Sequence, residues 1–321
     1  MSSYKSNTEY DSLTQFTNET LSLTDYVNGS KSLTDCAYEP LPLTDCVNQL
    51  LTQSLNDNKK KLSKGMISTI HPEIFLKYSS VNVFLGKQGK GKTFTMFKEL
   101  VKLSLIDRFA ESGAGMSSDV HLIVIVTKDG RIDETFESIK DNITIPYITV
   151  NYDEIIEYLN DLVFHKMIYD KIISENLMDK IDDEQLNETL SFLHLDNFEK
   201  SSLQEVIVFD DAAYKAILTS PKSQIISMIH EARHYKFIFC FCVQGIKAIP
   251  LPIKEQMTTL FLFSGFINQK LPTIYQQSGI TSIEYNDFKK LYHKLDEKDY
   301  ILVDCRNGTF KVVNGSLRYC E

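Results

Sequence analysis

One octapeptide decides the fold: Gly86-Lys-Gln-Gly-Lys-Gly-Lys-Thr93, which fits the phosphate-loop pattern G-x-x-x-x-G-K-[ST]. It follows the apolar run Val81–Leu85 directly and precedes a stretch with helical character. A strand, a glycine-rich loop and a helix in this order are the context in which the pattern binds phosphate. The alternative, a glycine-rich turn with solvated lysines, does not explain that context. The octapeptide therefore predicts a P-loop nucleoside triphosphatase.

The residue types of the loop suit triphosphate chemistry. Glycines let backbone amides converge on the β-phosphate, and we expect Lys92 to reach the β/γ oxygens. The Thr93 hydroxyl, at the helix N-terminus, is the expected Mg²⁺ ligand. The predicted cofactors are ATP and Mg²⁺. The predicted nucleotide-binding residues are Gly86, Lys87, Gln88, Gly89, Lys90, Gly91, Lys92 and Thr93.

A second acidic site follows the apolar run 206–209, which suits a central strand. Asp210 and Asp211 come at its carboxyl end, where ligands bind in open α/β sheets. We expect Asp210 to hold Mg²⁺, directly or through water, and Asp211 to polarise the attacking water as a catalytic residue. The alternative is an acidic strand end that starts a turn.

The next strand, 236–244, is apolar on both faces and ends in Gln244. Gln244 is a candidate for sensing the γ-phosphate or orienting the water by hydrogen bonding; a plain strand-end glutamine is the alternative. In sequence, a further strand lies between the phosphate-loop strand and the Asp210 strand, and the strand after Asp210 ends in a polar residue. This pattern fits the additional-strand class of ATPases and disfavours a small kinase.

The chain has only five arginines, and Arg233 stands between a helix and the Gln244 strand, which we interpret as the approach to the active-site edge. There it could stabilise transition-state charge on the nucleotide of a neighbouring subunit. The alternative is a helix C-terminal cation favoured by the macrodipole. The flanking His230 and His234 are interpreted as structural.

From about Ile67 onward, apolar strand-like runs alternate with helical patterns, as in a mostly parallel sheet covered by helices. We expect an α/β fold of the additional-strand, RecA/FtsK-HerA-like type, forming one ATPase domain over 65–321. An acidic exposed excursion or helical insert is expected over 176–200, and a hairpin over 299–313 through Asn307-Gly308. The predicted strands are 81–85, 121–127, 206–210, 237–244, 258–263, 300–304 and 309–313, and the predicted helices include 93–106 and 153–175.

Residues 1–64 differ in character from the rest. Ser12, Ser22, Ser32 and Pro42 each begin a Leu-Thr-containing repeat, ten residues apart, among polar neighbours. Such a segment cannot bury enough apolar surface to offset its ordering entropy, so we expect a flexible tail. It is either a duplicated spacer or a multivalent docking tail. The lysines of 59–64 form a basic linker that is solvated or touches DNA phosphates.

Composition narrows the class of protein. The net charge of −9 argues against a broad basic surface wrapped around nucleic acid, though not against a narrow basic pore or loop. No apolar run approaches the roughly 18 residues that span a bilayer, and no secretion signal is evident, so we expect a soluble, intracellular chain. The six cysteines show no CxxC spacing. We therefore expect reduced thiols and no zinc site, with Cys240 and Cys242 on one face of a buried strand.

Several segments together resemble the packaging ATPases of large DNA viruses, virophages and polinton-like elements, within the FtsK-HerA superfamily. The resembling residues are the phosphate loop 86–93, Asp133-Glu-Thr-Phe136, Val206-Ile-Val-Phe-Asp-Asp211, Arg233-His234, and Val243-Gln244 followed by Leu251-Pro252. The resemblance covers about Ile70 to Ser278. Asp211 departs from it, because that position is often glutamate, and neither the tail nor the acidic insert belongs to the pattern.

The resemblance implies a ring-forming homo-oligomeric motor that couples ATP hydrolysis to moving double-stranded DNA into a capsid. It also implies capsid or other virion assembly proteins as partners, and a place in the host cytoplasm, a viral factory or the virion. Two other classes remain open: a P-loop phosphotransferase acting on a small acceptor, and a non-enzymatic assembly protein switched by nucleotide.

Overall fold

The structure, a computed structural model, describes residues 76, 79–111, 119–128, 132–200, 202–210 and 224–314. The predicted repeat tail and basic linker over 1–64 lie outside these residues.

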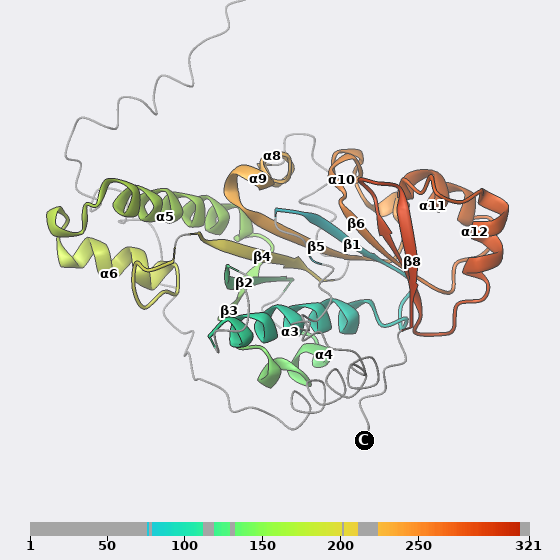
Figure 1. Cartoon of the computed structure of the whole chain (residues 1–321), viewed down its shortest axis with the longest axis horizontal. Helices are drawn as coiled ribbons and strands as arrows, with labels where there is room; N and C mark the ends of the chain where they lie inside the picture. The colour runs from blue at the N-terminus through green and yellow to red at the C-terminus, as the bar shows by residue number, and fades with distance from the viewer. Residues whose placement is uncertain are drawn as a thin grey trace, which may run out of the picture.

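The centre of the fold is an eight-stranded sheet (Figure 1). Its spatial order is β3-β2-β4-β5-β1-β6-β7-β8; the first six strands run parallel, and β7 and β8 are antiparallel to their neighbours. The strands are β1 (Val81–Leu85), β2 (Val120–Thr127), β3 (Tyr147–Asn151), β4 (Gln204–Phe209), β5 (Phe237–Val243), β6 (Thr259–Phe263), β7 (Tyr300–Asp304) and β8 (Thr309–Val313).

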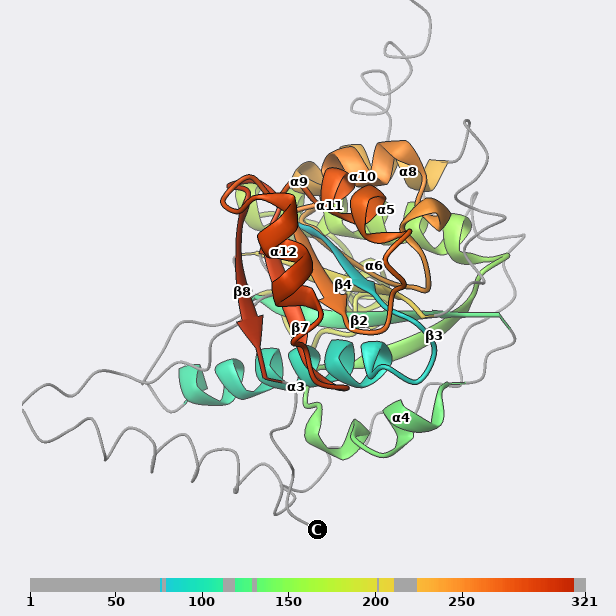
Figure 2. The same cartoon turned by 90° about the vertical axis from the view of Figure 1, so that its right-hand side faces the viewer.

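Helices cover both faces of the sheet (Figure 2). One face carries α3 (Lys92–Glu111) and the short α4 (Glu134–Glu137). The other carries α5 (Ile155–Glu175), α6 (Asp183–Phe192), α8 (Gln224–His230), α9 (Ala232–Tyr235), α10 (Leu251–Gln256), α11 (Leu271–Ser278) and α12 (Tyr285–Tyr292). Single 3₁₀ turns occur at Lys140–Asn142 (η2), Met178–Lys180 (η3) and Ile246–Ala248 (η5).

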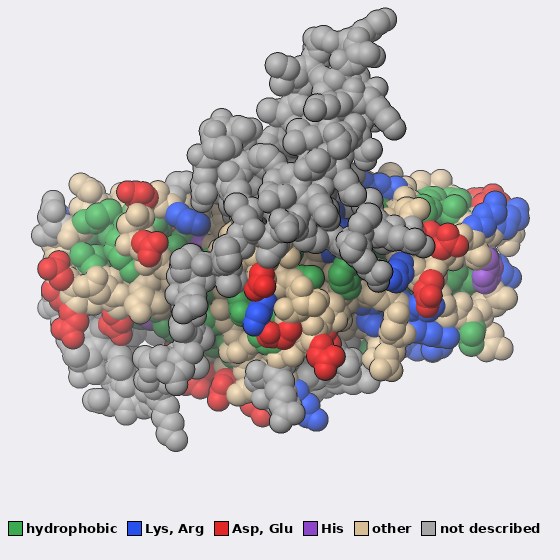
Figure 3. All heavy atoms as spheres, turned by 90° about the horizontal axis from the view of Figure 1, so that it is seen from below, with side chains coloured by type: hydrophobic (Ala, Val, Ile, Leu, Met, Phe, Trp, Pro, Cys, Tyr) green, Lys and Arg blue, Asp and Glu red, His purple; other side chains and the backbone are tan. Residues whose placement is uncertain are grey.

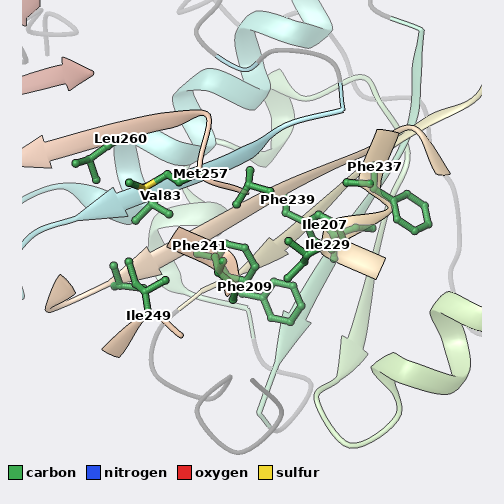
Figure 4. Close-up of a cluster of buried hydrophobic side chains, with 14 of the residues drawn as sticks. Val83, Ile207, Phe209, Ile229, Phe237, Phe239, Phe241, Ile249, Met257 and Leu260 are labelled. Carbon is green, nitrogen blue, oxygen red and sulfur yellow. The ribbon is translucent and has the colours of Figure 1, made fainter. Parts of the chain in front are cut away.

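Two hydrophobic clusters, one on each face, hold these layers together. The cluster beneath α8 and α10 takes alternate residues of β5, Phe237, Phe239 and Phe241, and packs them against the helices (Figure 4). The intervening residues Cys240 and Cys242 point to the α3 cluster. Because both faces are covered, β1, β2, β4, β5 and β6 are buried along their whole length, and each fully buried large side chain contributes about 1.5–3 kcal/mol.

The predicted α/β architecture with a mostly parallel sheet is confirmed, and seven of its strands occur within two residues of their expected ends. The strand β3 was not predicted from the sequence. This strand lies at the sheet edge and is only half covered, with Ile148 and Val150 buried and Tyr147, Thr149 and Asn151 partly exposed. Its alternating pattern was the available signal.

The acidic segment 176–200 contains the helix α6, so of the two expected forms, an exposed excursion or a helical insert, it takes the helical one. Asp182 caps α6 by accepting a hydrogen bond from Gln185 N at 2.8 Å. Phe192 at the other end stacks on Tyr158 and on His165 of α5, with ring centroids 5.6 and 4.3 Å apart. The insert is therefore a helical hairpin with α5.

Candidate nucleotide site

The phosphate loop joins β1 to α3, and its glycines are required by geometry. Gly89 and Gly91 have φ of +75° and +83°, a region that other residues rarely adopt. A Cβ on Gly86 would lie 2.7 Å from Cβ of Phe263 on β6. The Gly86 amide donates to the carbonyl of Val243 on β5 at 3.0 Å. Both neighbouring strands thus fix the start of the loop.

Lys92 and Thr93 begin α3 at the end of the loop. The Lys92 Nζ donates to the carbonyl oxygen of Lys87 at 3.1 Å, so the side chain folds back across the loop. The Thr93 Oγ1 donates to Asp210 Oδ1 at 3.0 Å. Asp210 directly follows β4, and the structure therefore brings together the two residues predicted from sequence to ligate Mg²⁺.

Thr93 and Asp210 supply a hydroxyl and a carboxylate, both hard oxygen ligands of the kind Mg²⁺ prefers. Within the described residues, no group of three or more His, Cys, Asp or Glu side chains could hold a metal. A site with few protein ligands suits Mg²⁺, which keeps waters and takes phosphate oxygens when it binds with a nucleotide. The donor set fits the predicted ion.

Cys242 lies beneath the loop with no nucleophilic role. Its Sγ is 3.5 Å from Sδ of Met96 in α3. Burial raises the pKa of the Cys242 thiol, and the negative charge of Asp210 raises it further. Burial likewise raises the pKa of Cys240. Both thiols stay protonated at neutral pH and serve as packing, on one face of a buried strand as the sequence predicted.

The outer part of the loop contacts the segment after β6 and the turn before β7, which the sequence analysis did not foresee. The Lys90 Nζ lies 3.3 Å from Glu297 Oε1. Gly265 has φ of +100°, which other residues rarely adopt, and a Cβ there would make a tight 3.1 Å contact with Cε of Lys90. Lys87, Gln88 and Gly89 are exposed. These three residues are the part of the loop most accessible to a ligand.

Gln244 lies at the same edge of the sheet as the loop. It is exposed and follows β5 directly. In space β5 lies between β1 and β4, with Val243 beside Leu85 and Phe241 beside Phe209. The additional strand is therefore β5, which ends at Gln244. The predicted one, which lies between β1 and β4 in the sequence, does not lie between them in the sheet. This arrangement places Gln244 between the loop and the Asp210 strand.

Arg233 is not on the approach to this edge, and that prediction is wrong within one subunit. It is exposed in α9, which ends just before β5 begins, whereas Gln244 follows the end of the same strand. Since β5 is parallel to β1, Arg233 lies where the parallel strands begin and Gly86 lies where they end, at opposite edges of the sheet along the strand direction. The sequence order suggested proximity, but the length of β5 separates the two residues.

Two further predictions from the sequence concern Asp211 and the segment 133–136. Asp211 lies outside the described residues. Asp133 accepts a hydrogen bond from Thr135 N at 2.7 Å and caps α4, while Phe136 is buried with edge-on ring contacts to Phe97 and Tyr147. In this chain Asp133 and Phe136 shape the fold beside α3.

Comparison with protein-family models and with curated proteins gives no match. Among solved structures, the chain is similar to the genome packaging NTPase B204 from Sulfolobus turreted icosahedral virus 2 in complex with AMPPCP, at 14% identity and a TM-score of 0.43, over 74% of this chain and 99% of that one. It is also similar to EssC (ATPases 2 and 3) from Geobacillus thermodenitrificans, at 14% identity and a TM-score of 0.41, over 70% of this chain and 38% of that one. A third is the pCW3 conjugation coupling protein TcpA with ATPγS, at 14% identity and a TM-score of 0.37, over 70% and 57%. At such scores these similarities decide nothing about activity.

Within the described residues, none of the helices combines the length and hydrophobicity needed to cross a bilayer.

Proposed function

We propose that this chain is a Mg²⁺-dependent ATPase. The observation that carries the proposal is the contact of Thr93 Oγ1 with Asp210 Oδ1 at the end of the phosphate loop. A magnesium ion there would neutralise charge on the β- and γ-phosphates. The loop amides and Lys92 would hold the phosphates, with Gln244 and Asp211 positioning and polarising the attacking water.

We further infer that hydrolysis moves double-stranded DNA, as in genome packaging into a capsid. Support comes from the order of the sequence segments that resemble packaging ATPases, and from the additional strand β5 between β1 and β4. The charge distribution suits a local DNA contact. Lysine and arginine side chains gather at the α12 end of the face in Figure 3, and aspartate and glutamate at the α5–α6 end.

The deciding experiment measures ATP hydrolysis with and without duplex DNA, using the full chain and a Lys92→Ala control. We expect hydrolysis that duplex DNA accelerates and that the control lacks. Hydrolysis without any response to DNA would contradict the translocation step and leave the ATPase. Phosphate transfer to an added small acceptor instead of water would indicate a phosphotransferase. Nucleotide binding without turnover would indicate a switch.

A further inference from the structure

A cavity of about 170 Å³ opens at the amino edge of the sheet, the edge opposite the phosphate loop. Two of the chain's five arginines line it, Arg233 from α9 and Arg306 from the turn between β7 and β8. His230, Ser79 and Thr258 add polar groups. Its volume is below the roughly 300 Å³ at which pockets for whole small molecules begin, so it suits a single chemical group.

The charge in this cavity favours an anion. Neither guanidinium forms an ion pair with a carboxylate in the described part of the chain. One carboxylate, Glu255, also lines the cavity, and the two arginines outnumber it. In a chain of net charge −9, two arginines with no ion pair in one concave site form an unusual concentration of positive charge. A planar guanidinium offers paired donors that match phosphate oxygens.

The wall that carries Arg306 is held by its backbone. Asp304 Oδ1 accepts hydrogen bonds from Arg306 N at 3.1 Å and from Asn307 N at 3.4 Å. The preceding residue, Cys305, donates its amide to the carbonyl of Thr258 at 3.0 Å, which ties the turn to the start of β6. The position of Arg306 at the cavity is therefore built into the fold.

The wall that carries Arg233 is held by a buried ion pair. Lys166 of α5 donates to the carbonyl of Tyr235, the last residue of α9, at 2.6 Å, and it also pairs with Glu205 of β4. Burial lowers the pKa of Lys166 and raises that of Glu205, and each partner only partly offsets the effect of burial on the other. Such a pair contributes little net stability, yet it fixes the position of α9.

We propose that Arg233 and Arg306 form one site for a single phosphate group, with Arg306 contributing as a second ligand. The backbone positions of both arginines are fixed by independent contacts, so only their side chains are ordered when an anion binds. Glu255 lies among them and limits the affinity, which suits a phosphate that must leave again.

The phosphate that best fits the site is the terminal one of a nucleotide held by a second copy of this chain. The parallel sheet gives each subunit two unlike edges, with the phosphate loop on one and the arginine cavity on the other. A head-to-tail contact, the kind that builds rings, would bring these edges together. Among the described residues no arginine lies at the loop's own edge, so such a contact would supply the missing cation. This choice of source rests on the proposed function, whereas the phosphate site itself does not.

The site is tested by NMR on the arginine side chains, because five Nε signals can be assigned by substitution. In the Lys92→Ala full chain, where the loop has lost its phosphate cation, inorganic phosphate should shift the Arg233 and Arg306 signals along one binding curve. Arg306→Gln should lower the phosphate affinity reported by the Arg233 signal about tenfold or more, as expected for loss of a charge-assisted contact. Glu255→Gln should raise this phosphate affinity, because it removes the negative charge from the cavity. Lys171→Gln, which removes an exposed cation outside the cavity, should change nothing. Signals that do not respond to phosphate, or an Arg233 response unchanged by Arg306→Gln, would overturn the site.

The source is tested by mixing chains. Arg306→Gln chains mixed with Lys92→Ala chains should recover part of the ATP hydrolysis that each lacks, because some interfaces then pair an intact loop with an intact cavity. No recovery in verified mixed assemblies would overturn the neighbouring nucleotide as the source. If adding a short DNA duplex, without inorganic phosphate, then shifts the NMR signals of both arginines, the phosphate group that the site binds belongs to DNA. A complete absence of ATPase activity in the unmodified chain would count against the proposed function, and the NMR titration would still decide the site.

Discussion

The hydroxyl of Thr93 donates a 3.0 Å hydrogen bond to the carboxylate of Asp210, which lies 117 residues further along the chain. Thr93 reaches this point because the phosphate loop that follows β1 leads directly into α3. Asp210 reaches it because β4 ends at the same edge, with β5 between them. The carboxyl ends of three parallel strands therefore assemble the candidate metal site, and its chemistry can be separated residue by residue.

Lys92→Ala should abolish ATP hydrolysis. Lys92 Nζ now caps the carbonyl of Lys87, and it is the side-chain cation that we expect to turn to the β- and γ-phosphates when nucleotide binds. Steady-state phosphate release is the measurement. Lys171→Ala, at an exposed lysine of α5 outside the loop, is the matched control and should retain turnover. A Lys92→Ala rate within about threefold of the parent chain would rule out this assignment, since loss of such a cation typically costs orders of magnitude.

Asp211→Asn should bind ATP and Mg²⁺ yet turn over slowly. Asp210 keeps the metal ligand, while the attacking water loses its base, an effect of about 10²–10⁴-fold. Asp210→Asn is the comparison and should weaken Mg²⁺ binding, because it loses a charged oxygen beside Thr93. Binding of a fluorescent nucleotide at varied Mg²⁺, alongside turnover, separates the two effects. If Asp211→Asn is the variant that loses Mg²⁺-dependent binding, the roles of the two acids are exchanged.

Lys166→Met should destabilise the fold by about 3–5 kcal/mol, because it leaves the fully buried Glu205 carboxylate without its charged partner. His121, with Nε2 3.3 Å from Glu205 Oε1, does not replace it, because burial lowers the pKa of His121 and keeps the ring neutral. The double variant Lys166→Met with Glu205→Leu should recover most of this loss, since no charge is then buried. Lys171→Met, at an exposed position of the same helix, should stay within about 0.5 kcal/mol. Denaturant unfolding measures all three. Equal stability of the Lys166 and Lys171 variants would show that Glu205 does not need this ion pair.

Removal of residues 1–55 should leave folding and basal ATP turnover unchanged. A largely polar segment whose repeated leucines lie ten residues apart contributes little to a core. Thermal unfolding and hydrolysis of the truncated chain check this expectation. A large fall in melting temperature would instead mean that the repeats pack on the α/β domain.

The sequence predicted most strongly where local signals coincide. The phosphate loop, the strands before Gly86 and Asp210, and the Asn307-Gly308 hairpin each combine a special residue with an apolar run, and the structure contains all of them. It failed where the answer depends on three-dimensional distance. The spacing between Arg233 and Gln244 gives no warning that β5 separates them by its full length, roughly 20 Å at about 3.3 Å per residue.

The same limit applies to contacts between distant segments. Arg306 directly precedes the Asn307-Gly308 turn signal, and its sequence context is that of an ordinary hairpin residue. It lines the same cavity as Arg233 only because β6 and β7 follow β1 in the sheet. The partners Lys166 and Glu205 come from a helix and a strand, and neither residue is unusual in its own segment. A single sequence carries no signal for such pairs.

The last prediction is that Arg233 acts across a subunit interface. In its own subunit it lies at the sheet edge opposite the loop, so a catalytic effect on its own nucleotide is excluded by geometry. A helix-end cation would affect stability by only about 1 kcal/mol and leave the chemistry alone. An arginine supplied in trans should instead change turnover about a thousandfold on substitution, with ATP affinity nearly intact.

The measurement mixes Arg233→Ala chains with Lys92→Ala chains, each expected to be inactive alone. Partial activity should return, because some interfaces pair an intact loop on one subunit with an intact arginine on the next. His234→Ala, which changes an exposed neighbour in the same helix, should be active without mixing and serves as the control. If mixing restores nothing in assemblies shown to contain both variants, Arg233 does not act on the nucleotide of a neighbouring subunit, and its distance from the loop of its own subunit excludes action there as well.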